Sequence, residues 1–215
     1  MAIPYRGQTS QSTYFVTAST FGKKALFQTE RTALLFLDVL SHYRTQGKFL
    51  LHEFVVMPDH FHLLITPCHG TTLERAIQLI KGGFSHRLKK ELGVNSQVWQ
   101  TSFYDRRVRD AAEYQKFREY IHQNPVALSL CADAGDCPYS SAASRIPLDA
   151  VPQRLKPLTK AAETQGRSPA PPTFPARDIN SLGIWYDFRF LGGAGLSLPN
   201  GCQDLLFLFR ACVCL

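Results

Sequence analysis

The chain has 215 residues, of which 45% are hydrophobic and 19% are charged, a composition typical of a globular protein with one domain and an extension. No apolar stretch reaches the ~18 residues of a membrane-spanning helix, and the first residues lack the apolar centre of a secretory signal. We therefore expect a cytoplasmic protein with no membrane contact. The net charge of +7 suits acidic partners such as nucleic acid, although a solvated helix face is the simpler explanation of charge alone.

The first part of the chain is predicted to form three strands and one helix. Apolar positions at helical spacing end at Gly47, a natural stop for a helix. Two strands rich in β-formers are joined by a turn at Pro58-Asp59. The predicted strands cover residues 12–17, 49–57 and 60–66, and the predicted helix covers residues 29–46.

A long amphipathic helix follows. Thr71 and Glu74 have the spacing of a capping box, and Gly93 is a natural end. Gly82 and Gly83 weaken the middle of this helix. Its apolar residues share one face, and most of its basic residues lie off that face.

A fourth strand or strand-loop is predicted over residues 98–108, before a last helix. That helix begins after Asp110, a plausible N-cap, and Pro125 is predicted to close it at Asn124. The element order predicts an α+β fold: a ferredoxin-like split βαβ sandwich, with an antiparallel sheet, helices on one face and an extra C-terminal helix. We expect the domain to span residues 1–145, and residues 146–215 to form a Pro-rich linker and an irregular or disordered tail.

Six cysteines occur in the chain, but none forms a Cys-x-x-Cys pair. This spacing disfavours a zinc knuckle. We expect reduced, mostly structural thiols.

Two histidines stand out, because His60 and His62 flank Phe61 on a predicted strand. Side chains alternate along a strand, so the two imidazoles share one face. Such a pair makes half of a metal site. For the pair by itself, an equally good interpretation is two structural histidines whose ring nitrogens are hydrogen-bonded within the sheet.

The last helix adds two further polar groups. Tyr120 and Asn124 are four residues apart and share a helix face. If that face covers the histidine strand, two imidazoles, an amide oxygen and a phenol surround one point, a set that suits Mg²⁺ or Mn²⁺. A tyrosine hydroxyl can attack a phosphodiester, and a divalent ion would stabilise the charge that develops. A half-buried aromatic residue with its hydroxyl in water is the alternative for Tyr120.

These residues resemble a known family. The segment Val56 to Leu64, which holds His60-Phe61-His62, is similar to the strand signature of the single-tyrosine HUH nucleases. The segment Tyr120 to Val126 resembles the tyrosine helix of one branch, the REP-associated tyrosine transposases of the insertion-sequence-200-like type. Supporting matches occur in Tyr14 to Thr17, Trp99 to Asp105 and Tyr139 to Ala142, and the resemblance covers about residues 12–143.

The resemblance implies a metal-dependent DNA-cleaving and rejoining transesterase. It makes Tyr120 the nucleophile that forms a 5′-phosphotyrosine with single-stranded hairpin DNA, and His60, His62 and Asn124 the ligands of Mg²⁺ or Mn²⁺. Repetitive extragenic palindromes are the implied partner, which places the protein at the nucleoid, as a monomer or a homodimer. Most of the positive charge falls between residues 75 and 118, a segment that contains ten Lys and Arg residues and four Asp and Glu residues. From that segment we predict DNA contacts for Lys81, Arg87, Lys89, Lys90, Arg106, Arg107, Arg109 and Arg118.

Two other functions remain open. A non-catalytic protein that binds structured DNA, such as a repressor of the same fold, would need no nucleophile. A water-using metallohydrolase usually has further His, Asp or Glu ligands, which are not seen at ligand spacing. The remaining histidines have no partner at such spacing and are expected at the surface or in turns: His42, His52, His69, His86 and His122.

Overall fold

The computed structural model describes residues 11–143, 146–152 and 155 of the chain. All of them belong to one compact unit, Met1–Gly166. The description below concerns these residues alone.

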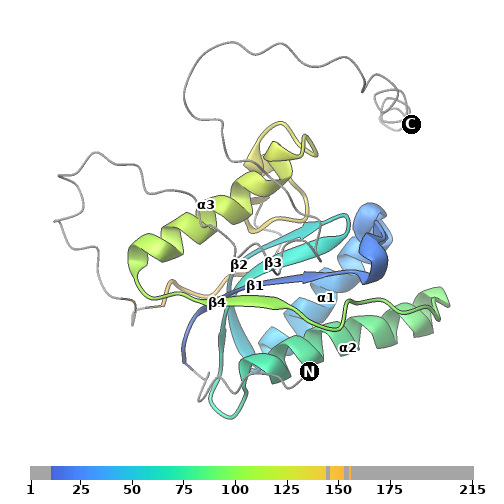
Figure 1. The fold of residues 1–215 in the computed structure, drawn as a ribbon, viewed down its shortest axis with the longest axis horizontal. Helices are drawn as coiled ribbons and strands as arrows, with labels where there is room; N and C mark the ends of the chain where they lie inside the picture. The colour runs from blue at the N-terminus through green and yellow to red at the C-terminus, as the bar shows by residue number, and fades with distance from the viewer. Residues whose placement is uncertain (1–10, 144–145, 153–154, 156–215) are drawn as a thin grey trace. The chain divides into compact units, whose positions relative to one another are not determined.

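A four-stranded antiparallel sheet forms the centre of the domain (Figure 1). Its strands lie in the order β2-β3-β1-β4, in which every neighbouring pair is antiparallel. This order, with helices between β1 and β2 and between β3 and β4, confirms the predicted split βαβ arrangement. The strands are β1 (Tyr14–Ser19), β2 (Phe49–Met57), β3 (His60–Pro67) and β4 (Tyr104–Arg107).

Three helices cover the two faces of the sheet. Helices α1 (Glu30–Thr45) and α2 (Leu73–Leu92) lie together on one face, and α3 (Ala111–Ala127) crosses the other (Figure 1). Strand alternation sends Phe61 and Leu63 towards α1 and α2, whereas His60 and His62 face α3. The extra C-terminal helix is thus present, and it occupies the face that α1 and α2 leave open.

The main hydrophobic core lies between the sheet and the α1–α2 layer. Phe36, Phe61, Phe84 and Trp99 are all buried there and lie in mutual ring contact. Trp99 also donates its indole N–H to the Lys81 carbonyl, at 2.9 Å. Buried aromatic rings supply large apolar areas, so this layer contributes much of the hydrophobic stabilisation of the sheet.

Some predicted boundaries are wrong. Strand β1 (Tyr14–Ser19) begins and ends two residues after the strand predicted over residues 12–17. Helix α2 is capped by Thr72, which accepts from the Arg75 N–H, so Thr71 is one residue too early. Of the strand or strand-loop predicted over residues 98–108, only Tyr104–Arg107 pairs with β1 as a strand. Helix α3 continues through Pro125 to Ala127, since the Asn124 and Pro125 carbonyls still accept from Leu128 and Leu130. The proline is buried, and its missing N–H removes only one hydrogen bond from the final turn.

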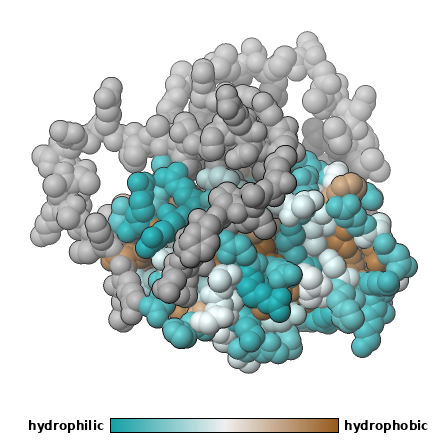
Figure 2. Space-filling model, turned by 60° about the horizontal axis from the view of Figure 1, so that its bottom comes forward, coloured by the Kyte–Doolittle hydropathy of each residue, from teal (hydrophilic) through white to brown (hydrophobic). Residues whose placement is uncertain are grey.

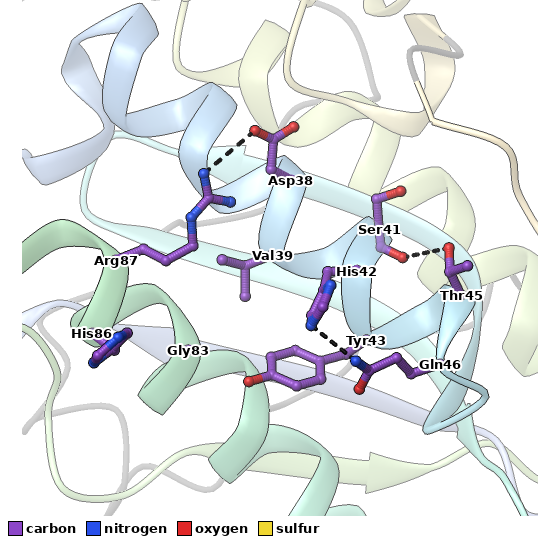
Figure 3. A pocket seen from close by; sticks show the side chains of 10 residues that line it. All are labelled: Asp38, Val39, Ser41, His42, Tyr43, Thr45, Gln46, Gly83, His86 and Arg87. Atoms are coloured by element: carbon purple, nitrogen blue, oxygen red, sulfur yellow. Dashed lines mark hydrogen bonds and ion pairs between the residues drawn. The ribbon is translucent and has the colours of Figure 1, made fainter. Parts of the chain in front are cut away.

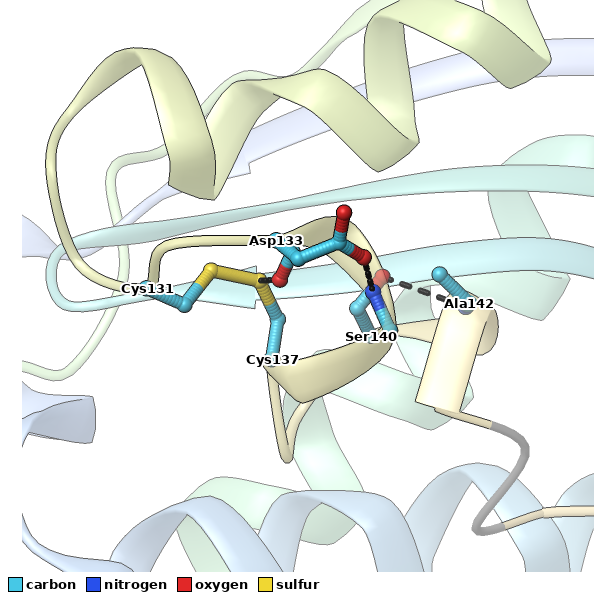
Figure 4. Close-up of a disulfide and its surroundings, with 6 residues drawn as sticks. Cys131, Asp133, Cys137, Ser140 and Ala142 are labelled. Carbon is cyan, nitrogen blue, oxygen red and sulfur yellow. Dashed lines mark hydrogen bonds between the residues drawn. A yellow bond between two sulfur atoms is a disulfide. The ribbon is translucent and has the colours of Figure 1, made fainter.

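The expectation of reduced thiols is wrong for one pair. Cys131 and Cys137 form a disulfide in the loop that follows α3 (Figure 4). Their Cα atoms lie 5.7 Å apart. The pair is six residues apart in sequence, a spacing that matches no metal-site or redox motif, so no sequence pattern predicted the disulfide. Cys68 is a free thiol.

The chain after α3 returns to the outer edge of β2. Ser140 forms a bridge with Val55, and the Tyr139 carbonyl accepts from the Val56 N–H. Further on, Asp149 binds Arg44 and accepts from the Leu51 N–H. Ile146 is also buried. The remainder of the tail predicted over residues 146–215 lies outside the described residues, so the proposed domain boundary stays a prediction.

A groove of about 770 Å³ lies between α1 and α2 (Figure 3). A Cβ atom added to Gly83 would approach the Tyr43 ring to 2.7 Å, so glycine allows the two helices to pack closely there. The groove is on the face of the sheet opposite His60 and His62. The surface seen in Figure 2 is largely hydrophilic, with small hydrophobic areas between. In the described part of the chain, no helix is both long and apolar enough to cross a membrane.

Candidate active site between β3 and α3

The two histidines of β3 form the base of the site. His60 and His62 are 4% and 2% exposed, and their ring centroids are 4.8 Å apart. In the register of the sheet, His60 lies opposite Ser19 and His62 lies opposite Thr17. The two imidazoles therefore stand side by side on the α3 face, as the alternation predicts.

Each imidazole is held through its Nδ1 atom. The Nδ1 of His60 lies 2.5 Å from the Asp59 carboxylate, and the Nδ1 of His62 lies 2.7 Å from the Thr17 hydroxyl. Burial raises the pKa of Asp59, but the hydrogen bond and charge of His60 and the charge of Lys23 outweigh it, and the pKa is lowered overall. An ionised carboxylate can only accept, so the Nδ1 of His60 donates this hydrogen bond.

Asn124 of α3 meets the second imidazole. Its amide nitrogen lies 3.3 Å from the Nε2 of His62, and its side chain is buried. Burial, with the neighbouring His60 second, lowers the pKa of His62 well below its usual value. His62 is therefore neutral, and Nε2 is its lone-pair nitrogen. A half-turn of the Asn124 amide would present its oxygen at the same place.

Tyr120 lies beside this group and belongs to the same chain. Its ring centroid is 5.2 Å from that of His62 and 5.7 Å from that of Phe15, both in edge contact. The side chain is partly exposed, so solvent reaches one side of the phenol. Helix α3 holds it there through the stacking of Phe117 on Phe15, at 4.4 Å, and the predicted N-cap Asp110, which accepts from the Glu113 N–H. The structure thus brings the predicted phenol, imidazoles and amide together.

These groups fit a divalent cation. Both Nδ1 atoms have partners, which is the usual arrangement of metal-binding histidines, because the partner fixes the ring and leaves Nε2 for the ion. Beside them, Ser19 Oγ is the buried side-chain oxygen without a hydrogen-bond partner among the described residues. The described residues hold no group of three or more His, Cys, Asp and Glu side chains suited to a metal. A cation here would therefore need the Asn124 amide as its third protein ligand.

Four of the predicted DNA contacts lie on α2, on the far side of the sheet from Tyr120. Lys81 donates to the Gln100 and Ser102 carbonyls, and burial lowers its pKa to about 8. Arg87 pairs with Glu91 at 2.6 Å. Lys89 and Lys90 are exposed. The structure does not bring these four residues to the tyrosine, and their role in DNA binding stays a prediction.

The other four predicted contacts lie nearer the site, and three of them pair with carboxylates. Arg106 contacts Glu113 at 2.6 Å and Arg109 contacts the same carboxylate at 3.2 Å. Arg118 binds Glu53 at 2.9 Å. Arg107 is exposed on β4. Contacts of these arginines with DNA also stay predictions.

Two histidines that were expected at the surface are mostly buried. His52 is 1% exposed and binds Thr66, and His122 is 15% exposed and binds Glu53. For His122 the cause is a β-bulge in β2, which turns its partner Glu53 to the α3 face. Sequence alternation alone does not reveal a bulge. The contact of Asp59 with His60 could have been predicted from the sequence, because the two residues are adjacent. The contact of Thr17 with His62 could be found only from the register of the sheet.

The family described as "Transposase IS200 like" matches residues 8–124, more than half of the chain. With the His-x-His strand and tyrosine helix in place, the chain belongs to this family. Membership implies the cleavage and rejoining of DNA.

Similar proteins support the more specific resemblance to REP-associated tyrosine transposases. A protein of that name from Escherichia coli K12 is 25% identical over 130 residues, covering 60% of this chain and 75% of that protein. A putative one from Haemophilus influenzae is 27% identical over 129 residues, covering 52% and 73%. The solved structure of a REP-associated tyrosine transposase bound to a REP hairpin has a TM-score of 0.57 at 22% identity, covering 70% of this chain and 92% of that one. This last likeness shows the shared fold.

Proposed function

We propose that the protein is a metal-dependent endonuclease and strand transferase that acts on single-stranded hairpin DNA through a covalent phosphotyrosine. The observation that carries this proposal is the contact between Tyr120 and His62 within one chain, with Asn124 at the Nε2 atom of the same imidazole. A non-catalytic DNA-binding protein would not need a partly exposed phenol beside two imidazoles that are both held through Nδ1.

The chemistry is a transesterification. The Tyr120 oxygen attacks the phosphorus, an O–P bond to tyrosine forms, and the bond to the 3′-oxygen breaks. The leaving oxygen takes up a proton as a 3′-hydroxyl, and the phenol proton passes to solvent. Mg²⁺ or Mn²⁺, held by His60, His62 and Asn124, would stabilise the charge on the phosphate oxygens. Reversal with a different 3′-hydroxyl joins strands without a nucleotide cofactor.

The proposed substrate is a palindromic hairpin of the REP type. Support comes from the solved relative of the same fold, which binds a REP hairpin, and from the curated relatives that carry the same name. The basic segment between residues 75 and 118 supplies charge for a phosphate backbone.

The test is incubation with a labelled single-stranded hairpin and Mn²⁺, followed by denaturing electrophoresis. We expect a protein–DNA adduct in the wild type and none in Tyr120→Phe, with hairpin binding nearly unchanged. Tyr114→Phe is the matched control, because Tyr114 lies on the same helix but is buried away from the imidazoles, against His52. This variant should still form the adduct.

The metal requirement is tested in the same assay. EDTA should stop cleavage, and added Mn²⁺ should restore it. Adducts that persist in Tyr120→Phe would show that another group is the nucleophile. Full cleavage in EDTA would show that the reaction does not require a metal ion. Hairpin binding by the wild type with no adduct at all would favour the non-catalytic alternative.

A further inference from the structure

A buried carboxylate on β2 binds the helix that carries the tyrosine. Glu53 is 6% exposed and accepts from Arg118 Nε at 2.9 Å, His122 Nε2 at 2.9 Å and Ser141 Oγ at 2.6 Å. Burial raises the pKa of Glu53, but these hydrogen bonds and the charges of His122 and Arg118 outweigh it and lower the pKa overall. The carboxylate is therefore ionised and fully paired at neutral pH.

The bulge in β2 is what places this carboxylate. Leu51 pairs with Ile65 and Glu53 pairs with Leu64, so His52 is an extra residue in the strand. In a regular strand, position 53 would share the face of Leu51 and enter the hydrophobic core. Bulges redirect side chains in this way and are common next to active sites.

The partners of Glu53 lie on the opposite side of α3 from the phenol. At about 100° per residue, Phe117 and Ile121 form the buried stripe of the helix, with Arg118 and His122 on one flank and Tyr120 on the other. A helix that is held on one flank cannot rotate about its axis without moving the opposite flank. The contacts of Glu53 therefore set the angle at which Tyr120 meets His62.

We propose that Glu53 is a positioning residue for the nucleophile: its contacts with Arg118 and His122 fix the rotation of α3 and hold Tyr120 against the imidazole pair. This inference rests on the proposed function, because it assumes that Tyr120 attacks DNA. Glu53 contacts the flank of α3 that carries Arg118 and His122, opposite the flank that carries Tyr120, so it acts through the helix.

The principal test is Glu53→Gln, measured by single-turnover adduct formation at saturating hairpin with Mn²⁺. The rate should fall by about 10- to 100-fold, because a misplacement of about 1 Å can slow a reaction by about 10²-fold. The Kd for the hairpin should stay close to that of the wild type. A purely structural role would instead reduce binding and rate in proportion to the folded fraction.

The control for lost stability is Asp149→Asn. This change also replaces a paired carboxylate by an amide, since Asp149 binds Arg44 of α1. The amide oxygen can still accept from the Leu51 N–H beside the bulge, so the bulge keeps this contact. It should lower the melting temperature and leave the adduct rate unchanged.

A second pair of variants decides the matter if Glu53→Gln does not fold. His122→Gln keeps a nitrogen donor near the position of Nε2 and should retain most of the rate, whereas His122→Phe keeps the ring and loses the donor, and should be slow. A wild-type rate in Glu53→Gln, or equal rates in the two His122 variants, would overturn the proposal. So would equal slowing in Asp149→Asn. These comparisons all require a wild-type protein that forms adducts. If the wild type forms none, the proposed function fails, and that result is distinct from a failure of the role proposed for Glu53.

Discussion

Replacement of Phe15 by leucine should affect the active site more than its cost in stability suggests. Phe15 is fully buried on β1, where its ring stacks on Phe117 at 4.4 Å and contacts His62 at 5.4 Å and Tyr120 at 5.7 Å. Leucine loses about 1 kcal/mol of apolar burial and about 1 kcal/mol of ring contacts. A loss of about 2 kcal/mol corresponds to a fall of roughly 4–8 °C in melting temperature.

The matched control is Phe36→Leu in the opposite layer. Phe36 is also fully buried and contacts Phe61 at 4.8 Å, on the α1–α2 side of the sheet. Both variants should melt at similar temperatures in a thermal denaturation experiment, but only Phe15→Leu should slow adduct formation in single-turnover assays, because it removes the surface against which the phenol and imidazole rest. Equal rates in the two variants, whether fast or slow, would refute this reasoning.

Three further predictions follow from single contacts. Asp59→Asn should weaken Mn²⁺ binding by about 10- to 100-fold, because a neutral amide replaces the carboxylate that contacts His60. Calorimetric titration measures the Kd for Mn²⁺, and an unchanged Kd would contradict this prediction. Reduction of the Cys131–Cys137 disulfide should lower the free energy of unfolding by about 2 kcal/mol, the value for so short a loop; denaturant unfolding with and without a reductant tests it. The pKa of Glu53 is lowered on folding, so its contribution to stability is complete above the unfolded pKa of about 4.3 and is lost as the pH falls through the lower folded value. The melting temperature should therefore fall less steeply between neutral and acid pH in Glu53→Gln, and parallel curves would argue against the effect.

The features that the sequence predicted are those set by local periodicity. Strand alternation placed His60 and His62 on one face, and helical spacing placed Tyr120 with Asn124, so the central group of the site follows from two short segments once the fold brings them together. The N-cap at Asp110 is likewise local. These properties depend on residues close in sequence, where the period of the backbone is known.

The features that the sequence did not predict depend on distant pairings. Glu53 reaches α3 only because β2 contains a bulge, and nothing in the local pattern marks the extra residue. Arg118 resembled a free cation in the sequence, but its guanidinium is paired with that buried carboxylate. Charge counted along a chain takes no account of a partner such as Glu53, which lies 65 residues from Arg118 in sequence.

The two borders of the sheet bear on how copies of the chain could associate. The outer side of β2 is already hydrogen-bonded by the segment that returns after α3, at Ser140 and Tyr139. On the other border, β4 has four residues, three of which are charged. Short, charged or covered strands discourage the addition of a strand from another molecule. A dimer of this protein would consequently join through its helices or loops and would not extend the sheet from one subunit into the next.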